Sequence, residues 1–166
     1  GIPYRTLPGS HATRGAYFTR GSTKDAYARY SEVGSDYIYN MERLLRKFDT
    51  ARALVPQPII GRAQGKAAAG VLYYGSTSPA MAEALALLRA QDVQLDHLRV
   101  RAFPFPDSVA DFIARHETVF VVEQNRDAQM RTLLVNEGAI DPARFISILH
   151  SDGTPITTRI ITTEIA

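Results

Sequence analysis

The chain of 166 residues contains no cysteine and no tryptophan. Without cysteine it forms no disulfide, no thiolate zinc site and no cysteine-ligated iron–sulfur cluster. A domain of this size buries roughly 70 % of the surface of its unfolded chain, so it does not need a disulfide or a metal site for stability. The absence of cysteine favours an intracellular location, and we expect the protein to be cytoplasmic.

A strong charge excess and long apolar runs are also absent. The formal net charge is +2 at pH 7, with acids and bases interspersed, and no basic block typical of nucleic-acid binding is present. No stretch approaches the roughly 20 apolar residues that a membrane-spanning helix needs. We therefore expect no nucleic acid and no membrane as partner. The start at Gly1 shows neither a signal-peptide plan nor an initiator Met, so we expect a piece excised from a longer protein.

Two compositions meet near the run from Pro56 to Pro58. Residues 1–34 are rich in Gly, Ser, Thr, Arg and Tyr and show little apolar periodicity, with one short helix expected over 23–30. Apolar side chains at three- and four-residue steps then predict an amphipathic helix over about Ser35–Leu54. The sequence thus predicts an irregular arm and a helix over residues 1–60, and an α/β domain over 61–166 that begins with a flexible link to Gly70.

From Gly70 onward, strand patterns alternate with helix patterns. Val119–Val122 is a continuous apolar run, which is typical of a strand buried on both faces of a parallel sheet. The other expected strands cover 71–74, 95–103 and 145–149, and residues 156–161 add an edge strand or dock elsewhere. Strands separated by helices predict an α/β fold: an open, mainly parallel sheet with helices on both faces, plus an extended N-terminal arm.

Residues that favour helix caps predict where the helices begin and end. Ser78 is expected to cap a helix with Pro79 at its first position, and Asp107 or Ser108 starts the next one. Asp127 is expected to cap a third helix over Ala128–Glu137, which ends near Gly138.

Polar side chains gather where ligands bind in open α/β sheets, at the carboxyl ends of the strands. Ser76 and Thr77 could cradle a phosphate at a helix N-terminus, but the loop lacks a phosphate-binding glycine motif or lysine, and an ordinary turn is the favoured alternative. Glu123, Asn125 and Arg126 suit either a general base with a substrate clamp or a structural or interface corner. We favour the second role, because no histidine or nucleophile lies near in sequence.

The arm supplies the remaining candidates, His11, Arg14 and Arg20. Arginine on a loop suits capture of a carboxylate or phosphate, and the favoured alternative is docking to the acidic surface of a partner. The other histidines do not cluster and have no metal-ligand spacing. We therefore predict no catalytic residue, no cofactor-binding residue and no metal site.

Two further motifs have a structural and a functional interpretation. The run from Phe103 to Pro106 is either a rigid turn or an aromatic surface that packs on another subunit. The run from Ser151 to Gly153 resembles the start of a thiamine-diphosphate signature, but the expected downstream Asn-Asn is absent, and a turn is the better interpretation.

Three stretches together resemble the α subunit of 2-oxoacid:ferredoxin oxidoreductases, most closely the 2-oxoglutarate type. They are residues 1–9, residues 13–21 and the run Val119–Leu134. Ala12 departs from the family, where proline is expected after the histidine. The resemblance covers essentially the whole chain, but it implies only the C-terminal portion of a much longer subunit.

The resemblance implies a domain like the transketolase C-terminal domain. It also implies oxidative decarboxylation of a 2-oxoacid, with coenzyme A accepting the acyl group and ferredoxin the electrons. Thiamine diphosphate, Mg²⁺ and an iron–sulfur cluster (4Fe–4S) are implied largely for the partner β subunit, and no catalytic residue of the family falls on this chain. We expect the isolated fragment to be inactive and to serve subunit assembly. The alternatives are a coenzyme A or small-ligand binding α/β module and a self-sufficient enzyme.

Overall fold

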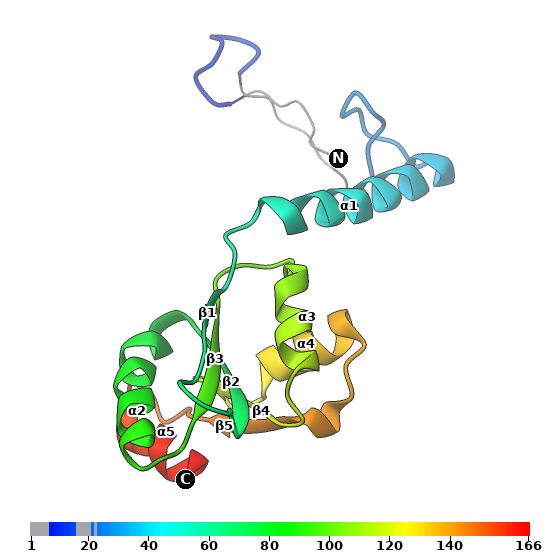
Figure 1. Ribbon diagram of the computed structural model, residues 1–166. Coiled ribbons are helices and arrows are strands. Elements are labelled where there is room, and N and C mark those ends of the chain that lie inside the picture. Colours follow the sequence, from blue (N-terminus) through cyan, green and yellow to red (C-terminus); the bar gives the residue numbers. More distant parts are fainter. Residues whose placement is uncertain (1–6, 16–20, 22) are drawn as a thin grey trace. The chain divides into compact units, whose positions relative to one another are not determined.

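The computed structural model describes residues 7–15, 21 and 23–166 (Figure 1). The chain divides into two compact units, Gly1–Leu54 and Val55–Ala166. The sequence places the boundary at residue 60. The structure places it earlier because Ile59–Gly61 is a strand of the second unit's sheet.

The first unit contains one long helix, α1 (Gly34–Leu54), which confirms the amphipathic helix that the sequence predicts. The short helix expected over 23–30 is wrong. Instead, Lys24 and Tyr30 form an isolated antiparallel bridge, and Asp25 Oδ1 accepts hydrogen bonds from the backbone N–H groups of Tyr27 and Arg29 at 2.8 and 2.9 Å. An aspartate that binds the local backbone in this way favours a turn over a helix.

The second unit, described in full, is built on a five-stranded sheet in the order β1-β3-β2-β4-β5. The strands are β1 (Ile59–Gly61), β2 (Ala69–Tyr74), β3 (Leu95–Val100), β4 (Val119–Glu123) and β5 (Phe145–Leu149). Strands β2 to β5 pair in parallel, and β1 pairs antiparallel to β3. The mainly parallel sheet that the sequence predicts is confirmed, with an antiparallel strand added at one edge.

Helices cover both faces of this sheet (Figure 1). On one face, α2 (Ser78–Ala90) and α5 (Thr158–Ile165) bury Met81, Leu88 and Ile161 against it. On the other face, α3 (Asp107–Ala114) and α4 (Gln129–Gly138) bury Phe112 and Leu134. Strands β2 and β4 therefore pack on two cores, which is why residues 71–73 and 119–122 are continuous apolar runs.

The antiparallel strand β1 lies just before the flexible link that the sequence predicts over 61–70, and shares only Gly61 with it. It runs close to β3 because Gly61 has no side chain: a Cβ atom there would lie 2.2 Å from the ring of His97. Residues 158–165 form helix α5 and not an edge strand. Thr157 caps it by accepting a hydrogen bond from the Ile160 N–H at 3.4 Å.

Two of the expected helix caps are wrong. The Ser78 hydroxyl donates back to the Gly75 carbonyl at 3.0 Å, because a short 3₁₀ turn (Gly75–Thr77) leads directly into α2. Asp127 does not cap α4 either: the residue before that helix is Ala128, in a left-handed conformation with no side-chain cap. The residue that satisfies the start of α4 belongs to β4.

Candidate functional site

The carboxyl ends of β2, β4 and β5 meet at one edge of the sheet, where the sequence places its strand-tip candidates. Glu123, the last residue of β4, is fully buried. Its Oε2 accepts hydrogen bonds from the Met130 N–H at 2.7 Å and from the Asn125 side chain at 2.8 Å, and its Oε1 accepts from the Arg131 N–H at 3.0 Å. Three N–H donors thus converge on its two oxygens, and each oxygen accepts at least one hydrogen bond.

Glu123 therefore serves as the cap of α4 from outside the helix. The first N–H groups of a helix have no partner within it and carry a partial positive charge, so a buried carboxylate is stabilised there. Asn125 completes the arrangement, since its Oδ1 accepts from the N–H groups of Asp127 and Gln129 at 3.1 and 3.2 Å.

Gln124 connects three segments that are far apart in sequence. Its Nε2 donates to the hydroxyl oxygens of Ser76 at 3.0 Å and Thr77 at 3.3 Å. Its Oε1 accepts from the backbone N–H of Ile156 at 3.0 Å. Ser76 and Thr77 are thus partners of this amide, and the structure contains the turn that the sequence favours there over a phosphate cradle.

Asn125 also donates to the Tyr74 hydroxyl at 3.3 Å. Burial raises the pKa of Tyr74, and the nearby charge of Glu123 raises it further. A phenol in this environment stays protonated and is no general base near neutral pH. Arg126 turns outward and pairs with Asp127 at 2.7 Å, with 84 % of its side chain exposed.

Taken together, the strand tips form a closed hydrogen-bond network. The buried carboxylate caps a helix, the two amides join loops, and the arginine lies in solvent. That these residues serve a structural or interface role stays a prediction, with which this arrangement is compatible. It supplies neither a nucleophile nor a general base directed at an open cavity.

The candidates of the first unit are described in part. His11 Nδ1 accepts hydrogen bonds from the backbone N–H groups of Thr13 at 3.1 Å and Arg14 at 3.0 Å, so the ring closes a local turn. Arg20 lies outside the described residues. Whether these side chains bind a ligand or a partner stays a prediction.

A second polar cluster, which the sequence does not indicate, lies at the amino edge of the sheet. Asp96 accepts hydrogen bonds from the Ala63 N–H at 2.8 Å, from the Arg62 guanidinium and from His116 Nε2 at 3.2 Å. Burial raises the pKa of Asp96, but the hydrogen bonds from Ala63 and Arg62 outweigh it, so the pKa lies below its usual value. This cluster fastens β1 to the sheet. The sequence signal that could have revealed this cluster is an acidic residue at a strand position that is otherwise buried.

Two histidines of the second unit, His116 and His150, form hydrogen bonds within the fold. His116 is buried, with Nδ1 2.8 Å from the Phe112 carbonyl oxygen. His150 Nε2 lies 2.8 Å from the Thr154 carbonyl oxygen. The neighbouring run from Ser151 is a turn, in which Asp152 Oδ1 accepts from the Thr154 N–H at 2.8 Å. The turn interpretation of the run is thus confirmed.

The aromatic-proline loop after β3 holds its two rings edge to face. The ring centroids of Phe103 and Phe105 lie 5.2 Å apart, and Phe103 remains 41 % exposed. The structure is compatible with both interpretations of this loop, and contact with another subunit stays a prediction.

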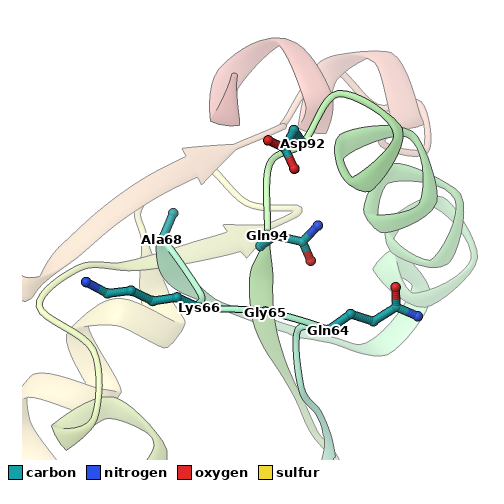
Figure 2. Close-up of a pocket in the computed structure, with 6 residues that line it drawn as sticks. All are labelled: Gln64, Gly65, Lys66, Ala68, Asp92 and Gln94. Atoms are coloured by element: carbon teal, nitrogen blue, oxygen red, sulfur yellow. The ribbon is translucent and has the colours of Figure 1, made fainter.

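Each of the two units contains an open hollow. One, of about 490 Å³, is at the amino edge, lined by Gln64, Gly65, Lys66, Ala68, Asp92 and Gln94. Figure 2 shows the Lys66 side chain directed away from the amide of Gln64. The other, of about 520 Å³, lies in the first unit, lined by Lys24, Asp25, Ala26, Ala28, Tyr39, Asn40 and Arg43.

Among residues 7–15, 21 and 23–166, no three His, Asp or Glu side chains are grouped so as to hold a metal ion. In the same part of the chain, no helix has both the length and the apolar character needed to cross a membrane. With no cysteine in the sequence, the residues present do not fit an iron–sulfur cluster.

Comparisons with known proteins identify the fold. No protein-family model matches the chain, and no curated protein matches it. The structure is similar to 2-oxoglutarate:ferredoxin oxidoreductase from Magnetococcus marinus, solved with 2-oxoglutarate, coenzyme A and succinyl-CoA bound. The TM-score is 0.78 at 19 % sequence identity, over 95 % of this chain and 27 % of that chain. The chain adopts the fold of that segment.

A second solved structure matches less well. It is the alpha chain of a probable 2-oxoacid ferredoxin oxidoreductase from Thermoplasma acidophilum, with a TM-score of 0.42 at 21 % identity, over 66 % of this chain and 93 % of that chain. The chain spans about a quarter of the length of the Magnetococcus chain. At this identity the likeness establishes the fold alone.

Proposed function

We propose that the chain is the C-terminal domain of the α subunit of a cytoplasmic 2-oxoglutarate:ferredoxin oxidoreductase. The observation that carries this proposal is the fold match to the Magnetococcus enzyme over 95 % of the chain. The three stretches that resemble the family, including Val119–Leu134, support it from the sequence. The complete enzyme oxidatively decarboxylates a 2-oxoacid, passing the acyl group to coenzyme A and the electrons to ferredoxin.

Within that enzyme, the domain serves subunit assembly and not chemistry. Its strand-tip carboxylate and amides form hydrogen bonds within the domain, and the chain has no cysteine that could ligate a cluster. Thiamine diphosphate, Mg²⁺ and the iron–sulfur cluster belong in this proposal to the partner β subunit. The oxidoreductase activity therefore requires another chain.

Helix α1 supplies a surface suited to assembly. None of its 21 residues is buried. Its apolar face includes Ile38 and Leu45, with exposed fractions of 60 % and 67 %, and Tyr37 at 51 %. A contiguous apolar face on an otherwise charged helix marks a site of protein–protein contact, and aromatic residues are enriched in such contacts. We propose that the β subunit binds to this apolar face.

The test uses the complete α subunit that contains this chain, produced together with its β subunit. Leu45→Glu places a charge on the apolar face of α1, and burying a leucine contributes roughly 1.5–3 kcal/mol to an interface. We expect the dissociation constant of the two subunits, measured by interferometry on immobilised α subunit, to rise at least about tenfold.

Leu87→Glu is the matched control, because Leu87 is 46 % exposed on α2 and receives the same change. This variant should bind the β subunit like the wild type. Wild-type affinity in Leu45→Glu, or turnover of 2-oxoglutarate by the 166-residue chain alone, would refute the assembly role.

A further inference from the structure

We propose that the hollow of the first unit, between the turn at residues 24–28 and helix α1, binds a nucleoside diphosphate. Its volume of about 520 Å³ lies within the usual range for small-ligand sites, roughly 300–1,000 Å³. This inference does not depend on the assembly role, which involves the apolar face of α1.

Two cations line the hollow. Arg43 comes from α1 and Lys24 from the turn. Within the described part of the chain, the Arg43 guanidinium has no hydrogen-bond or ion-pair partner, although the residue is half-buried. The Lys24 ammonium donates to one acceptor, the Gly21 carbonyl at 2.8 Å, and so retains further donors. Arginine and lysine together suit the oxygens of a diphosphate.

The wall that carries Lys24 is held in place before any ligand binds. Asn40 Nδ2, on α1, donates to the Lys24 carbonyl and, at 2.9 Å, to the Asp36 carbonyl. The lining carboxylate of Asp25 is directed into its own turn by the N–H groups of Tyr27 and Arg29. The turn and the helix therefore form a preorganised pair of walls, which lowers the entropic cost of binding.

An aromatic ring and a free amide oxygen complete the lining. Tyr39 lies one turn of α1 before Arg43 and is 45 % exposed, so a planar base can stack on its ring. Asn40 uses its amide nitrogen to hold the turn, and its Oδ1 has no partner among the described residues, so it can accept a hydrogen bond from a base amino group. A ring beside two cations matches a nucleotide better than a simple inorganic anion.

The experiment is calorimetric titration of the 166-residue chain with ADP, with pyrophosphate and with a hexaglutamate peptide. We expect saturable ADP binding that is tighter than pyrophosphate binding. Arg43→Gln should raise the ADP dissociation constant about tenfold or more, because it removes charge-assisted hydrogen bonds. Tyr39→Leu should weaken ADP about fivefold or more and leave pyrophosphate binding unchanged, because it removes stacking alone.

Arg46→Gln is the matched control, since Arg46 lies on α1, pairs with Glu42 at 3.8 Å and does not line the hollow. Circular dichroism confirms that each variant keeps its helix. The proposal is overturned if ADP shows no saturable binding below about 1 mM, or if Arg46→Gln weakens ADP as much as Arg43→Gln does. Pyrophosphate binding as tight as ADP refutes the nucleoside part, and displacement of ADP by hexaglutamate assigns the hollow to an acidic protein surface.

Discussion

The substitution Glu123→Gln tests whether this buried carboxylate caps α4. The wild-type carboxylate accepts from the N–H groups of Met130 and Arg131 and from the Asn125 side chain. Glutamine has the same shape but only one acceptor oxygen, so its NH₂ group must face a donor. One backbone N–H at the helix start loses its partner and the favourable charge is removed. Hydrogen bonds to a charged group contribute roughly 1.5–3 kcal/mol, and the helix dipole adds about 0.5–1 kcal/mol.

We therefore expect Glu123→Gln to lower the free energy of unfolding by about 2–4 kcal/mol, which corresponds to a fall in Tm of roughly 4–16 °C for a chain of this length. Urea denaturation followed by circular dichroism measures it. Two variants serve as controls. Asp127→Asn should change stability by less than about 0.5 kcal/mol, because Asp127 pairs with Arg126 on the surface. Glu117→Gln makes the same chemical change at an exposed position and should behave likewise.

The decisive result is the order of the variants. A loss in Asp127→Asn equal to or larger than that in Glu123→Gln would restore Asp127 as the cap and refute the reasoning. A change of less than about 0.5 kcal/mol in Glu123→Gln would show that the buried carboxylate contributes no more than an amide.

Two further predictions concern the polar groups that join the segments of the second unit. Folding lowers the pKa of Asp96 below its usual value of 3.8, so its contribution to stability is present above that pH and is lost as the pH falls through the lower, folded-state value. Urea denaturation at pH 7 should show that Asp96→Asn is about 1–3 kcal/mol less stable than the wild type. This difference in stability should narrow toward about pH 2–3, where the wild-type carboxylate becomes protonated. A difference that stays constant with pH would contradict a stabilising role of the ionised Asp96. Gln124→Leu leaves the N–H of the buried Ile156 without its acceptor, so thermal unfolding should show a loss of about 1–2 kcal/mol; an unchanged Tm contradicts the bridge.

The sequence predicted the central elements well because their patterns are long or fully apolar. Val119–Val122 and Phe145–Leu149 read as buried strands, and both are strands within one residue of the expected bounds. It could not predict β1, since three residues with one glycine carry no periodicity and depend on pairing with β3. It left residues 156–161 open between an edge strand and docking elsewhere. Thr and Ile favour a strand locally, but packing of Ile161 against α2 selects a helix.

The residues at the strand tips were likewise predicted only in part. The sequence placed Ser76, Glu123 and Asn125 at one edge of the sheet, since carboxyl ends of parallel strands meet there. It could not show that Gln124 joins two loops or that Glu123 points back into the start of α4. Those contacts join residues up to 48 positions apart, and nothing in the local pattern encodes them.

Residue order by itself determined the alternation of strands and helices, the long helix α1 and the layered α/β class, because burial of apolar side chains requires their periodicity to match the element that carries them. Only the tertiary structure decided the partner of each polar group. A buried carboxylate or amide is stable wherever donors and acceptors converge on it, and that convergence exists only once the separate segments have packed together.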